Sequence, residues 1–84
     1  MIEILSHESN FAVVQLPGRK FPGVVIQGDS LKVLLDLAEE LTTYLKEGEA
    51  KDLAEELSEQ LRFRLDEYEK VLNGKGIQLP YVRP

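Results

Sequence analysis

The sequence predicts an α+β domain: a three-stranded antiparallel sheet packed against an antiparallel two-helix hairpin, in the order β-β-β-α-α, with an extended C-terminal tail. Two observations predict it. β-branched and aromatic residues gather in residues 1–28, whereas residues 29–73 are rich in Leu, Glu, Lys and Ala. Pro-Gly pairs interrupt the strand-like residues 1–28. In the helix-like part that follows, Gly48 separates two helical segments and Gly74 ends the second. With 84 residues, we expect one domain spanning 1–84.

Three short segments have the composition of strands: Ile2–Leu5, Phe11–Leu16 and Val24–Gln27. Turn residues at 7–10 separate the first two strands, which predicts a hairpin. Pro17 ends the second strand because proline has no backbone N–H to donate. The connection to the third strand is short enough for an antiparallel arrangement.

Both faces of this sheet carry apolar residues. In the second strand, Ala12, Val14 and Leu16 share one face, and Phe11 and Val13 share the other. Two helices cover only one face of a three-stranded sheet. We therefore expect a homodimer through the sheet or its edge, with Phe11, Val13 and Val25 in the contact, because contiguous exposed apolar patches usually mark interaction sites. The alternative is that these are ordinary scattered surface residues.

Two helices are expected, each with an apolar stripe at helical spacing. The first runs from about Leu31 to Lys46, with the stripe Leu31, Leu34, Leu35, Ala38, Leu41 and Leu45. The second runs from Glu49 or Ala50 to Leu72, with the stripe Ala50, Ala54, Leu57, Leu61, Leu65, Tyr68 and Leu72. The short link at Gly48 makes the helices antiparallel neighbours. On the outer face of the second helix, Arg62 is expected to pair with Asp66.

The C-terminal tail, residues 77–84, is extended by its prolines. Ile77, Leu79 and Tyr81 are too apolar for a free terminus, so we expect them to dock on the helices. The alternative is a proline-containing recognition arm.

Charge and composition exclude several function classes. The net charge is −5, which argues against nucleic acid and anionic membrane as partners but allows a basic protein partner. The chain has no Cys, so disulfides and thiolate metal sites are excluded. We expect no signal peptide and no membrane span, and therefore a cytoplasmic protein.

No catalytic, metal or cofactor site is expected. His7 is the only histidine and lies in a turn, where an exposed polar role is commoner than catalysis. The acids of both helices are expected on the polar faces, as a solvated surface. No nucleophile–base or metal constellation emerges, so an enzyme is the least favoured class.

Two short segments remain as candidate binding sites. Gly18, Arg19, Lys20 and Phe21 lie between two Pro-Gly pairs, and an exposed cation beside an aromatic residue is typical of protein-binding loops. The alternative is an ordinary loop with Phe21 folded into the core. Gly28, Asp29 and Ser30 join the third strand to the first helix. They predict a helix cap by Asp29 or Ser30, with small-ligand binding at the helix N-terminus as the alternative.

Residues 11–45 resemble the N-terminal core of the HicB-type antitoxin family. The resemblance rests on Phe21-Pro22-Gly23, Val25, Gln27-Gly28-Asp29-Ser30 and the helix after Leu31. It departs in residues 49–72, which read as a long helix where the family continues into a strand. The whole-length pattern is also similar to small bacterial proteins of a domain of unknown function. That whole-length similarity implies no activity. We expect a non-enzymatic protein-binding module, and the HicB-type resemblance makes an antitoxin-like or immunity-like role its most specific form. A small-ligand or regulatory domain that uses the corner Gly28-Asp29-Ser30 is the alternative.

Overall fold

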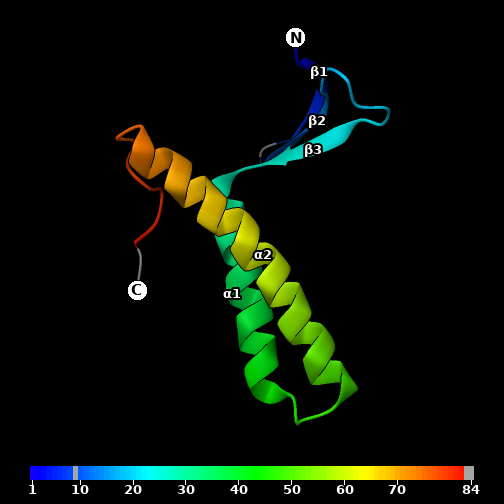
Figure 1. Cartoon of the computed structure of the whole chain (residues 1–84), viewed down its shortest axis with the longest axis vertical. Coiled ribbons are helices and arrows are strands. Elements are labelled where there is room, and N and C mark those ends of the chain that lie inside the picture. Colours follow the sequence, from blue (N-terminus) through cyan, green and yellow to red (C-terminus); the bar gives the residue numbers. More distant parts are fainter. Residues whose placement is uncertain (9, 83–84) are drawn as a thin grey trace.

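The computed structural model describes residues 1–8 and 10–82. Three strands precede two helices: β1 Glu3–His7, β2 Phe11–Gln15, β3 Gly23–Ile26, α1 Gly28–Tyr44 and α2 Glu49–Gly74. The strands form one antiparallel sheet in the order β1-β2-β3, and the helices form an antiparallel hairpin (Figure 1). This confirms the predicted α+β fold class. Ser9 of the predicted turn and residues 83–84 of the tail lie outside the described residues.

The largest boundary differences are at β1 and α1. β1 continues to His7, past a register shift between Ile4 and Ser6. α1 begins at Gly28, and its N-cap residue Gln27 makes no side-chain capping bond. Asp29 lies inside the first turn and accepts a hydrogen bond from the Ser30 backbone N–H at 2.8 Å. The predicted cap by Asp29 or Ser30 is therefore wrong, although an acid in the first turn still favours the helix dipole.

α2 ends in a Schellman motif. Gly76 has a φ of +70°, a backbone conformation that residues with a Cβ rarely adopt. The Ile77 N–H donates to the Leu72 carbonyl at 2.9 Å, and the Gly76 N–H donates to the Asn73 carbonyl at 3.3 Å. These bonds satisfy carbonyls that the helix end would otherwise leave open, and they turn the chain back along α2.

The fully buried apolar core is small. It lies mainly between the helices, where Leu35 and Leu65 are fully enclosed and Ala38 and Ala54 are buried. Val14, in the middle strand, is the remaining buried apolar residue among those described. Three leucines of the predicted apolar stripes, Leu34, Leu41 and Leu57, are instead 42%, 50% and 51% exposed. Each helix therefore has its stripe in the expected place, but the partner helix covers only part of it.

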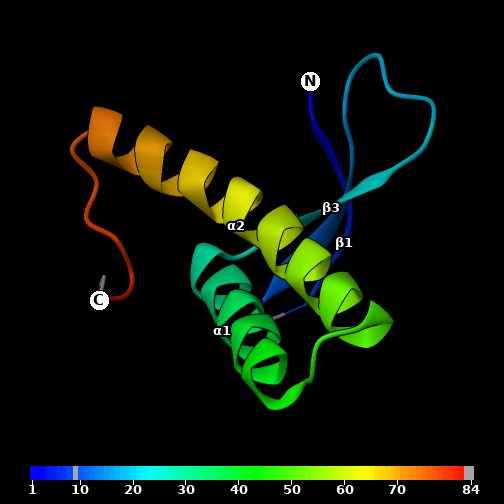
Figure 2. The same ribbon diagram turned by 60° about the horizontal axis from the view of Figure 1, so that its bottom comes forward.

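The sheet and the helical hairpin meet only at a corner. β3 leads directly into α1, and the sheet extends away from the helices in the view of Figure 1. In Figure 2 the same strands lie behind the helices. The predicted stacking of the hairpin on the sheet is thus restricted to the residues around this corner. Ile4, Val24 and Val25 consequently remain more than half exposed.

The strand register decides which apolar residues share a face. Phe11 pairs with Ile26 and Val13 pairs with Val24, whereas Val25 pairs with Ala12. Paired residues of an antiparallel ladder have side chains on the same face. Phe11 and Val13 therefore lie on one face and Val25 on the other, so these three residues do not form a single contact face. The homodimer itself stays a prediction.

Candidate protein-interaction surfaces

The loop Gly18–Phe21 lies at the far end of the sheet from the helices. Pro17 and Gly18 begin a tight turn in which the Arg19 N–H donates to the Leu16 carbonyl at 3.3 Å. Gly18 has a φ of +78°, and the Gln15 side-chain amide donates to the Arg19 carbonyl at 2.8 Å. The base of the loop is thus held by backbone and amide bonds, which leaves its side chains available for contact.

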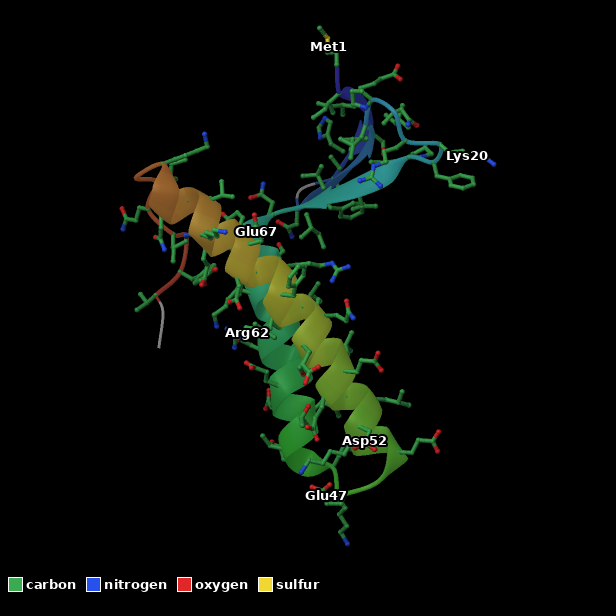
Figure 3. The ribbon with its side chains drawn as sticks, viewed as in Figure 1. Met1, Lys20, Glu47, Asp52, Arg62 and Glu67 are labelled. Carbon is green, nitrogen blue, oxygen red and sulfur yellow. The ribbon has the colours of Figure 1, made fainter. Side chains whose placement is uncertain are left out.

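All four predicted partner-binding residues of this loop are exposed. Phe21 is 73% exposed, so the alternative in which it folds into the core is wrong. The Lys20 ammonium lies 5.4 Å from the centroid of the Phe21 ring, within cation–π range. Figure 3 shows Lys20 at the outer tip of the molecule, away from both helices. The loop therefore presents an aromatic ring and two cations at one protruding tip.

The strand-to-helix corner is shaped by close packing at Gly28. Gly28 is buried, and a Cβ built on it would overlap ring atoms of Tyr68 from α2. Because Gly28 has no side chain, the Tyr68 ring fits beside its backbone. This contact packs α2 against the start of α1. Asp29 is exposed and Ser30 is half-buried.

A hollow of about 400 Å³ adjoins this corner, and its lining includes His7, Gln27, Gly28 and Tyr68. Asp29 and Ser30 do not line it. The alternative of ligand binding by Gly28, Asp29 and Ser30 as one site stays a prediction, and the Tyr68 ring occupies the space next to Gly28.

An open apolar face runs along the helices and ends at the sheet. Its first part is a groove of about 340 Å³ between the helices, lined by Leu34, Leu37, Ala38, Leu41, Leu57 and Leu61. Its second part is a groove of about 360 Å³ at the corner, lined by Asn10, Phe11, Ile26, Ser30, Val33 and Leu34. Leu34 belongs to both grooves, so they form one continuous surface.

The tail docks on the helices through two of its three predicted residues. The Tyr81 hydroxyl donates to Oε2 of Glu69 at 2.7 Å, and Glu69 is only 5% exposed. The Lys32 ammonium of α1 lies 5.7 Å from the Tyr81 ring centroid. Leu79 is half-buried, but Ile77 is 52% exposed, so its predicted docking is wrong. A tyrosine bond therefore satisfies a carboxylate that would be costly to bury alone.

Arg62 joins the two helices. Its guanidinium donates to Oε2 of Glu39 at 2.9 Å, rather than pairing with Asp66 as predicted. The hydrogen bond to Glu39 is the main cause that raises the pKa of Arg62. At the hairpin turn, the hydrogen bond from Lys51 to Glu47 likewise raises the pKa of Lys51. Both pairs are partly solvent-exposed, so each contributes little to stability.

Within residues 1–8 and 10–82, no three His, Cys, Asp or Glu side chains lie close enough together to hold a metal ion. Over the same residues, neither helix is long and apolar enough to cross a bilayer. The features that stand out are the protruding loop and the open apolar face.

A known protein family matches nearly the whole chain. The model of a family of unknown function, DUF6959, matches residues 1–81. No curated protein and no solved structure matches the chain. The match extends over both the sheet and the helical hairpin and reaches the docked tail. The chain therefore belongs to the DUF6959 family of unknown function.

Proposed function

We propose that this chain is a non-enzymatic protein-binding module that contacts its partner through the loop Gly18–Phe21. The observation that carries the proposal is the 73% exposure of Phe21 at the tip of that loop, beside Arg19 and Lys20. Aromatic and arginine side chains supply a large share of binding energy at protein interfaces. The rigid base of the loop reduces the entropy lost on binding.

The more specific form of the proposal is an antitoxin-like or immunity-like role. The net charge of −5 would accelerate the encounter with a basic protein, and the loop would then supply local contacts. The HicB-like pattern in residues 11–45 suggested this form, but the family match of residues 1–81 is to a family of unknown function, so the form stays a prediction. A cytoplasmic location fits the same proposal.

Replacing Arg19, Lys20 and Phe21 together by Ala tests the loop. A tagged chain is used to capture a partner from cells of the source organism; the partner is then purified and its affinity is measured by calorimetry. The triple variant should lose at least about 30-fold in affinity, as expected for a binding hot spot. Its free energy of unfolding should change by no more than about 0.5 kcal/mol, because all three side chains are exposed.

The matched control replaces Lys46 and Lys75 by Ala. The control also removes two positive charges, but from exposed positions far from the loop in sequence. If the control loses as much affinity as the triple variant, charge alone explains the effect. If the triple variant binds the purified partner as well as the unchanged chain does, the loop is not the contact surface.

The hollow beside Gly28 is the observation that favours a second candidate function, small-ligand binding. A panel of phosphate-bearing compounds tests it by thermal shift, because a ligand that binds only the folded state raises the melting temperature. The absence of any shift at millimolar ligand would contradict this candidate.

A further inference from the structure

We propose that a second copy of this chain covers the open apolar face, so that two α1–α2 hairpins pack together as a four-helix bundle with two-fold symmetry. This inference goes beyond the proposed function and does not depend on it, because the loop Gly18–Phe21 lies outside the open apolar face. Its basis is the area of uncovered surface, the spacing of the exposed leucines and the chemistry of the groove.

The single chain leaves far more surface in water than a compact domain of its size. Its accessible surface is 6814 Å², whereas a compact monomer of 9.5 kDa exposes about 5,050 Å². Its radius of gyration is 15.3 Å, against about 12 Å for a compact domain of 84 residues.

The surplus surface has the size of a dimer interface. Two chains that each covered the surplus would bury about 3,500 Å² between them, which lies within the range of obligate dimers. A weak or transient contact would bury only about a third of that area. The surplus therefore indicates a permanent partner that is similar in size to this chain.

α1 carries a second apolar seam beside the stripe that packs on α2, along the open side of the groove between the helices. Leu34, Leu37, Leu41 and Tyr44 follow one another at spacings of three, four and three residues. They are 42%, 57%, 50% and 77% exposed. This alternation of three and four is the spacing at which one helix packs along another in a left-handed bundle. α2 already packs on the neighbouring stripe of α1 through Leu35 and Ala38, so the exposed seam needs a helix from elsewhere.

The groove between the helices has no charge with which to select a partner of opposite charge. It is lined by Leu and Ala side chains. A basic protein would find its complementary charges on the polar sides of the helices instead. Another copy brings the same leucine seam and the same groove, so a two-fold axis can pair the two surfaces with themselves. A helical hairpin that dimerises in this way completes a four-helix bundle.

The corner groove extends this interface to one face of the sheet. Phe11 and Ile26 lie beside Val33 and Leu34 there. The second copy would cover these residues and leave Val25, on the opposite sheet face, in solvent. The centre of the interface is therefore helical, in contrast to the sheet contact that the sequence predicted.

The oligomeric state of the purified chain tests the proposal. By light scattering or sedimentation at about 10 μM, we expect twice the 9.5 kDa mass of one chain. The double variant Leu37→Lys with Leu41→Lys should raise the dimer dissociation constant at least about 100-fold, because it places four charges in the apolar interface. Lysine has nearly the helix propensity of leucine, so each helix should persist. The control Phe63→Lys changes an apolar residue that is 73% exposed and outside the open apolar face, and it should remain dimeric.

Cross-linking keeps the proposal testable if the lysine variant does not fold. The chain has no cysteine, so Leu41→Cys introduces a single thiol into the seam. A short bis-maleimide should join two Leu41→Cys chains and should leave Phe63→Cys chains unlinked. A monomeric wild-type chain, a dimer that survives the lysine substitutions in folded protein, or linking of Phe63→Cys alone would each overturn the proposal.

Salt dependence distinguishes a second copy from a basic partner. Two chains of net charge −5 repel each other, so self-association should tighten when salt rises from about 50 to about 500 mM. Association with a basic protein would weaken over the same range. Dimerisation that weakens as salt is added would therefore argue against an apolar contact between like-charged copies.

Discussion

Replacing Gly28 by Ala should destabilise the fold by about 1–3 kcal/mol, the usual cost of overpacking. The added methyl would overlap Cζ, Cε2 and Oη of Tyr68, whose ring lies where the Cβ would be. The ring is half-buried between the start of α1 and α2, so it can escape only by giving up packing. For a domain of this size, the melting temperature should fall by roughly 5–15 °C. Far-UV circular dichroism at one fixed protein concentration measures it, because association shifts the midpoint.

Gly74→Ala is the matched control. Gly74 is also helical, its φ is not positive, and no atom lies within 4 Å of a Cβ built on it. This substitution should be neutral or should stabilise by up to about 1 kcal/mol, through helix propensity and the entropy of the unfolded chain. The cost at Gly28 should also disappear in a Tyr68→Ala background, because the two residues are coupled only through their contact. An equal cost in both backgrounds, or a Gly28→Ala variant as stable as Gly74→Ala, would refute the reasoning.

Three further predictions concern polar contacts. Tyr81→Phe keeps the ring but removes the bond to buried Glu69, so it should cost about 1–2 kcal/mol in thermal unfolding; an unchanged midpoint would contradict this. A double-mutant cycle of Glu39→Gln and Arg62→Ala should give a coupling of at most about 1 kcal/mol that shrinks with salt, because both side chains are about half exposed; a larger, salt-independent coupling would contradict it. The raised pKa values of Arg62 and Lys51 mean that these cations stabilise the fold below their unfolded pKa values and lose that effect as pH rises through the raised ones. Neither cation should make the melting temperature depend on pH between about pH 7 and 9. The contribution of Lys51 should begin to fall only above 10.5, the ordinary pKa of a lysine, as melting temperatures measured over a series of pH values would show.

The sequence predicted the order of elements because local patterns carry that information. The β-branched segments, the leucine spacing and the glycines at 48 and 74 each depend on residues close together in the chain. The contact between Gly28 and Tyr68 joins residues forty positions apart and leaves no trace in either segment alone. The bond from Arg62 to Glu39 is equally non-local, and its competition with the predicted pair inside α2 depends on how the helices cross.

Helical periodicity identifies the apolar side of a helix but not what covers it. Leu34, Leu41 and Leu57 fall on the apolar stripes, which predicts that a neighbouring element buries them. In the single chain they are about half exposed, since α1 and α2 share only part of those stripes. The exposure of these stripe leucines therefore indicates that a further partner covers them. Burying each leucine fully contributes about 1.5–3 kcal/mol relative to leaving it in water, so a covering partner would add several kcal/mol per chain.

The two proposals together have a consequence for binding strength. A dimer formed through the open apolar face would carry two Gly18–Phe21 loops, each at the end of a sheet that extends away from the helices. A partner with two matching sites would then bind the second loop intramolecularly, at an effective concentration far above that of free chains. The Leu37→Lys and Leu41→Lys variant should therefore bind a bivalent partner more weakly although its loop is unchanged. A monovalent partner should not distinguish the two forms, because each loop acts alone.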